Sequence, residues 1–120
     1  MTFLKSETMP RTIVLSRSDK DLSAASSFGE IEYIFERPPS PFKVDDLVHG
    51  VLNRLEEIAF DAEEDFIVMT GPPDRLATLM GTICVNYEGP FKILIFDASS
   101  HQYSLRIFRP VPDESPEYVG

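Results

Sequence analysis

The run Phe66-Ile67-Val68-Met69 is the feature that most constrains how this chain can fold. It has no polar residue at alternate positions, so an extended segment here must be covered by protein on both faces. The turn Thr70-Gly71-Pro72-Pro73 follows it, and a helical pattern over 74–87 comes after the turn. A central strand in a sheet with helices on both sides satisfies this arrangement.

Composition and charge set the class of protein. The 120 residues, 42% of them hydrophobic, suit one compact domain. The formal net charge of −9 argues against direct binding of DNA or RNA, which depends on lysine and arginine neutralising phosphates. No apolar run approaches the ~20 residues that cross a bilayer, and residues 1–10 lack the apolar core of a signal peptide. We therefore expect a cytoplasmic protein without a membrane contact.

Apolar periodicity predicts five strands and three helices. The clearest helical stripe begins at Val44, and the short second element is expected to be a weak helix capped by Ser18 or Asp19. The last helix has only small polar positions, so we expect it to be buried on more than one face. The predicted elements are strand 12–15, helix 22–28, strand 30–36, helix 44–58, strand 66–69, helix 74–87, and the strands 92–97 and 103–108 of a hairpin.

This order of elements predicts an α/β fold. We expect a small three-layer Rossmann-like or flavodoxin-like domain, with a mostly parallel sheet of order 2-1-3-4-5 and an antiparallel C-terminal edge strand. The second strand suits an edge, because Glu30, Glu32 and Glu36 share one of its faces. The domain is predicted to span residues 12–109, after an N-terminal arm (1–11) and before an acidic, proline-rich flexible tail (110–120).

A candidate ligand site lies where the strand order reverses, beyond the carboxyl ends of the first and third strands. Arg17 and Arg75 are placed to hold a small anion there, or else each pairs in solvent with Asp19 or Asp74. Asp97, at the end of the fourth strand, is either a partner of Asp74 in metal or acid–base chemistry or a turn-forming residue. The candidate ligand-binding residues are Ser16, Arg17, Ser18, Thr70, Gly71, Asp74, Arg75 and Asp97.

The motifs of several enzyme classes are missing. Pro72 and Pro73 remove two of the N–H groups that a phosphate-binding loop needs, and both glycine fingerprints of nucleotide sites are absent. His49 and His101 have no second ligand at metal-binding spacing, and no G-x-S-x-G elbow occurs. We assign no catalytic residue, no metal ligand and no cofactor, and the sequence favours a protein without catalytic activity.

The acidic segment 56–65, together with Ala77 and Gly81, two small residues four apart that would let another backbone approach closely, forms a candidate interaction surface. The alternative for the acidic segment is a solvated helix end and loop. The hypothesis favoured is a non-enzymatic module that binds or inhibits a macromolecular protein partner, with a homodimer among its expected forms. The alternatives are a small-ligand domain or enzyme that takes a nucleotide or anionic metabolite, and a structural component of a larger assembly. The surface residues are Glu56, Glu57, Asp61, Glu63, Glu64, Ala77 and Gly81.

Several short segments resemble a set of short uncharacterised α/β proteins from tailed phages. They are Ser16-Arg17, Phe28-Gly29-Glu30-Ile31, Ser40-Pro41-Phe42, His49 and the run from Asp65 to Pro72. The similarity covers residues 12–108 and brings no activity with it. It implies a phage or prophage origin, hence the host cytoplasm, and favours a small protein that acts by binding something larger.

Overall fold

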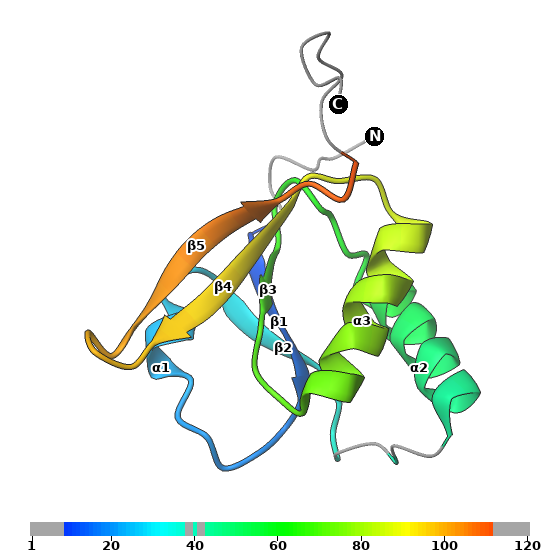
Figure 1. The fold of residues 1–120 in the computed structure, drawn as a ribbon, viewed down its shortest axis with the longest axis horizontal. Helices are drawn as coiled ribbons and strands as arrows, with labels where there is room; N and C mark the ends of the chain where they lie inside the picture. Colours follow the sequence, from blue (N-terminus) through cyan, green and yellow to red (C-terminus); the bar gives the residue numbers. More distant parts are fainter. Residues whose placement is uncertain (1–8, 38–39, 41–42, 112–120) are drawn as a thin grey trace, which may run out of the picture.

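A five-stranded sheet of order β2-β1-β3-β4-β5 forms the centre of the protein (Figure 1). The computed structural model describes residues 9–37, 40 and 43–111, so the predicted arm and tail lie almost wholly outside the described residues. β1 to β4 are parallel where they pair, and β5 is antiparallel to β4, which confirms the predicted α/β fold and strand order. The elements are β1 (Arg11–Ser16), α1 (Ser23–Ser26), β2 (Glu30–Phe35), α2 (Val44–Glu57), β3 (Phe66–Val68), α3 (Pro73–Asn86), β4 (Phe91–Asp97) and β5 (Gln102–Phe108).

β3 is the central strand, as the apolar run predicts. It pairs with β1 on one side and with β4 on the other. Ile67 belongs to the core beneath α2 and α3, and Val68 belongs to a second cluster beneath α1; neither is exposed to solvent. Protein therefore covers both faces of this strand.

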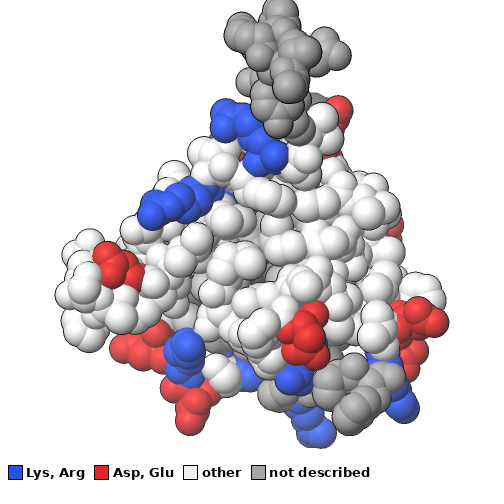
Figure 2. Space-filling model, viewed as in Figure 1, with Lys and Arg blue, Asp and Glu red and all other residues white. Residues whose placement is uncertain are grey.

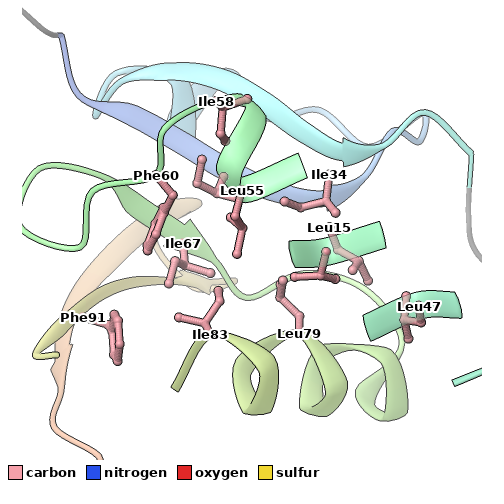
Figure 3. Packing of buried hydrophobic residues seen from close by; sticks show 12 residues of the cluster. Leu15, Ile34, Leu47, Leu55, Ile58, Phe60, Ile67, Leu79, Ile83 and Phe91 are labelled. Atoms are coloured by element: carbon pink, nitrogen blue, oxygen red, sulfur yellow. The ribbon is translucent and has the colours of Figure 1, made fainter. Parts of the chain in front are cut away.

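The larger core lies between the sheet and the α2–α3 pair. Figure 3 shows Leu55 of α2 and Leu79 and Ile83 of α3 directed towards Ile67 of β3. Burying each such side chain contributes about 1.5–3 kcal/mol, so this layer is the main source of stability. None of the helices in the described part of the chain is long and apolar enough to cross a membrane.

The outer side of α3 is open to solvent. Ala77, Gly81 and Val85 lie four residues apart on this side, and all three are exposed. The prediction that α3 is buried on more than one face is wrong for this stripe, because no other element of the described chain packs there.

Two details of the helices differ from the prediction. α1 has only four residues, and neither Ser18 nor Asp19 caps it; instead the Oδ1 of Asp21 accepts a hydrogen bond of 2.9 Å from the Ser23 N–H. Serines that compete for backbone bonds explain why the helix stays short. Val44 is 53% exposed, so the buried stripe of α2 begins one turn later. The short α1 leaves its side of the sheet thinly covered.

The glycines inside α2 and α3 have opposite surroundings. A Cβ added to Gly50 would lie 2.6 Å from Cε1 of Phe35, whereas one added to Gly81 would meet nothing within 4 Å. We expect Gly81→Ala to raise the free energy of unfolding by about 0.5–1 kcal/mol through helix propensity. Gly50→Ala is expected to lower it by about 1–3 kcal/mol, because the Phe35 ring must move. Urea denaturation measures both, and a shift of the same sign in the two variants contradicts this account.

Candidate functional site

The structure places both halves of the predicted crevice at the end of the sheet where the parallel strands have their carboxyl ends. Ser16 ends β1, and the turn after β3 contains Thr70 and Gly71. Gly71 has a φ of +132°, and a Cβ on it would lie 3.1 Å from Cδ2 of Leu15. The turn therefore packs against the end of β1 at a position that favours glycine.

The two arginines of the crevice are engaged by neighbouring carboxylates. Arg17 Nε donates to Glu36 Oε1 at 2.7 Å, and its guanidinium stacks on the ring of Tyr33 at 4.2 Å. The hydrogen bond with Glu36 raises the pKa of Arg17 and lowers that of Glu36. Arg75 lies 3.8 Å from Asp74. Because β2 and β3 flank β1 on opposite sides, Arg17 reaches away from the turn after β3.

The remaining polar candidates form hydrogen bonds within their own turns. The Oγ of Ser18 accepts a bond of 3.2 Å from the Lys20 N–H. Asp97 Oδ1 accepts bonds from the Oγ (2.7 Å) and the N–H (3.0 Å) of Ser99, and these hold the pKa of Asp97 below its ordinary value. Such a carboxylate shapes the hairpin turn. Within the described ranges, no three His, Cys, Asp or Glu side chains are grouped to hold a metal ion.

The bond between Ser99 and Asp97 predicts a specific titration. We expect Ser99→Ala to raise the pKa of Asp97 towards its ordinary value, because the side-chain bond is the largest cause of the lowering. A lowered pKa means that this bond stabilises the fold above the unfolded pKa and is lost as the pH falls through the folded one. NMR titration of the carboxyl carbon measures the change, with Ser104→Ala as the control. An unchanged pKa in Ser99→Ala contradicts the assignment.

A cavity of about 660 Å³ lies at the opposite end of the sheet, by the amino ends of the parallel strands. The sequence did not predict it. Arg11 forms part of its wall, and its guanidinium donates to the carbonyls of Ile58 and Ala59 and pairs with Asp65 at 3.1 Å. A cation bonded to the last carbonyls of a helix stabilises that helix end. Arg11 therefore ties the end of α2 to β1 and to the start of β3.

The acidic segment is divided between the wall of the cavity and the last turn of α2. Asp61 and Glu63 line the cavity together with Glu88. Glu57 accepts a bond of 2.9 Å from Arg54, and the Glu56 charge, after the larger effect of burial, raises the pKa of Tyr87. Glu64 is half-buried beside the cavity loop. A role for these carboxylates in binding a partner stays a prediction.

The structure exposes an apolar surface that the sequence analysis missed. We call it the hairpin surface: Phe96, Leu105 and Ile107, which are 44–47% exposed and lie on one face of the sheet by the register of β4 and β5. Ile95 and Phe108 are also exposed, on the other face. Figure 2 shows that the face carrying the hairpin and α3 is largely free of charged side chains, which lie at its margins. The signal in the sequence was two apolar strands at the end of the domain, followed by an acidic, proline-rich segment that has no helical apolar pattern.

Comparison with known proteins identifies a family. The family model of the phage Pam3 gp32-like protein matches residues 3–109, which include every strand and helix described above. Comparison with curated proteins and with solved structures gave no match. The match agrees with the resemblance to tailed-phage proteins seen in the sequence. The chain therefore belongs to the phage Pam3 gp32-like protein family.

Proposed function

We propose that this protein is a non-enzymatic interaction module, encoded by a phage, that binds a protein partner through the hairpin surface. The observation that carries the proposal is the contrast within one strand. On the face that carries α1, β4 buries Leu94 completely, but Phe96, two residues further along the same face, is 47% exposed. Leu105 and Ile107 of β5, on that face too, are 44% and 46% exposed. Contiguous apolar surface of this kind on a soluble domain marks an interaction site.

The charges around the hairpin surface define the partner further. Arg106 lies on β5, Arg109 follows that strand, and the Nζ of Lys92 lies 4.9 Å from the ring centre of Phe66. Residues 102–108 contain no Asp or Glu. We expect a partner surface with an apolar centre and acidic groups at its rim. A permanent partner of this kind would make the protein a structural component of a larger assembly.

A pair of matched substitutions tests the proposal. Ile107→Glu places a charge on the hairpin surface, and Val85→Glu places the same charge on α3, where the native side chain is 84% exposed. The tagged proteins are used to capture partners from the cells in which the protein is naturally made. We expect wild type and Val85→Glu to retain the same partner and Ile107→Glu to lose at least about tenfold, or 1.4 kcal/mol, in affinity. Equal capture by all three, or no partner at all, overturns the proposal.

A small anionic ligand at the carboxyl-end edge is the second candidate function. It is favoured by the close packing of the Thr70–Gly71 turn on the end of β1, with Arg75 of α3 beside it. A thermal-shift screen with nucleotides and inorganic phosphate tests it, since a ligand at a hundred times its Kd adds about 2.7 kcal/mol of stability. We expect Arg75→Ala to abolish any such shift. No shift with any compound removes this candidate.

A further inference from the structure

The two edges of the sheet differ in how they resist pairing with another strand. β2 forms one edge and carries Glu30 and Glu32, and Glu36 follows it. Arg54 reaches this strand from α2 and donates at 2.9 Å both to Glu32 Oε1 and to the carbonyl of Tyr33. Charged side chains and a covering helix are ordinary means of blocking an edge. The β2 edge is therefore protected.

β5 forms the other edge and lacks this protection. It pairs with β4 along all seven residues, so the N–H and C=O groups of its outer side have no strand of the described chain beside them. Residues 102–108 contain no Pro, Asp or Glu, and Arg106 is their one charged residue. The Nη1 of Arg106 donates a hydrogen bond of 3.3 Å to the carbonyl of Leu105 in the same strand. The backbone N–H of a pairing strand would take the place of this side-chain donor. The outer side of β5 is a template for a further strand.

We propose that a second copy of this chain pairs with β5, antiparallel and centred on Leu105. In this register Leu105 faces itself, and Tyr103 of each copy faces Ile107 of the other. Ser104 then faces Arg106, so no like charges stand opposite each other. Aromatic residues opposite β-branched residues stabilise strand pairs, whereas opposed like charges destabilise them. The sequence of β5 is therefore complementary to itself.

The pairing also unites the apolar side chains of the two copies. The register between β4 and β5 places Phe96, Leu105 and Ile107 on the same face of the sheet, the face that carries α1. In the dimer Leu105 and Ile107 of one copy lie beside Leu105 and Tyr103 of the other. Two sheets of five strands become one continuous sheet, and the twofold contact is closed, so it ends at a dimer.

The charge distribution favours a second copy at this edge. Two chains of net charge −9 repel each other over most of their surfaces. The repulsion is smallest where each copy presents no carboxylate, and β5 is such a segment. The inference rests on the proposed function, since the dimer joins the hairpin surfaces of both copies into the surface that a further partner would meet.

Disulfide trapping in the full-length chain tests the register. In a Cys84→Ser background, Leu105→Cys places two thiols opposite each other with Cα atoms about 4.5–5.5 Å apart, within reach of a disulfide. Ile107→Cys is the matched control in the same strand, because the two copies of residue 107 lie four residues apart, about 13 Å. We expect Leu105→Cys to form a covalent dimer on mild oxidation and Ile107→Cys to remain monomeric.

The mass in solution provides the second measurement. Light scattering after gel filtration is expected to give twice the mass of one chain for wild type and the monomer mass for Leu105→Arg, which opposes two like charges. A wild-type monomer at every concentration, or equal cross-linking at 105 and 107, overturns the inference. If wild type is a monomer and Ile107→Glu still weakens partner capture, only the dimer is refuted. A dimer whose partner capture is unchanged in that variant refutes only the proposed function.

Discussion

Replacing Leu79 by alanine is expected to lower the free energy of unfolding by about 2–5 kcal/mol. Leu79 is fully buried in the core between α3 and the sheet, beside Leu15, Ile67 and Ile83 (Figure 3). The substitution removes buried methyl groups and leaves a cavity that close-packed neighbours fill only in part. For a domain of this size the loss is a large share of the total stability. Urea denaturation monitored by circular dichroism measures it.

Val85→Ala is the matched control on the same helix. Val85 is 84% exposed, so removing its methyl groups creates no cavity and is expected to change the stability by at most about 0.5 kcal/mol. A small gain is expected, because alanine has the higher helix propensity. If the two variants lose equal stability, the described core does not lie on the inner side of α3.

The strand order was predictable because the local composition of the strands indicates which of them lie in the middle of the sheet and which at its edge. The run 66–69 is apolar throughout, and a strand of that kind is stable only in the middle of a sheet. The glutamates of β2 are tolerated only at an edge. With the central strand and one edge assigned, the right-handed connection rule leaves few other orders.

The hairpin surface was not predictable from local pattern, because exposure there depends on what another element fails to cover. Phe96 and Leu105 belong to strands whose apolar patterns match those of buried strands. They are exposed because α1 has four residues and because no helix follows β5 within the described chain. A pattern shows that a strand can be buried, but the length of a distant helix decides whether it is.

The candidate site shows a similar division. The sequence predicted that Ser16 and Thr70 lie at the same end of the sheet, because neighbouring parallel strands have their carboxyl ends on the same side. It did not show that Arg17 turns towards Glu36, since the side-chain direction depends on a partner 19 residues away. It also gave no sign of the bonds between Arg11 and Asp65, which are 54 residues apart. Contacts at that separation leave no local pattern.

Asp65→Ala is expected to lower the free energy of unfolding by about 3–5 kcal/mol. The Asp65 side chain is 1% exposed and accepts three hydrogen bonds: from the backbone N–H of Arg11, from the Nη2 of Arg11 in their ion pair, and from the backbone N–H of Asp61. Removing the carboxylate leaves backbone donors unpaired and the guanidinium of Arg11, 15% exposed, without its counter-charge. The end of α2 and the starts of β1 and β3 then lose their common link.

Two further variants separate this explanation from a general effect of acidic-residue loss. Glu63→Ala, two residues earlier in the same loop and exposed, is expected to change stability by at most about 0.5 kcal/mol. Arg11→Ala also destabilises the fold, but the double variant is expected to lose less than the sum of the two single losses, because both remove one pair. Additive losses would show that Asp65 acts without Arg11. In that case this pair does not hold the end of α2 to the starts of β1 and β3.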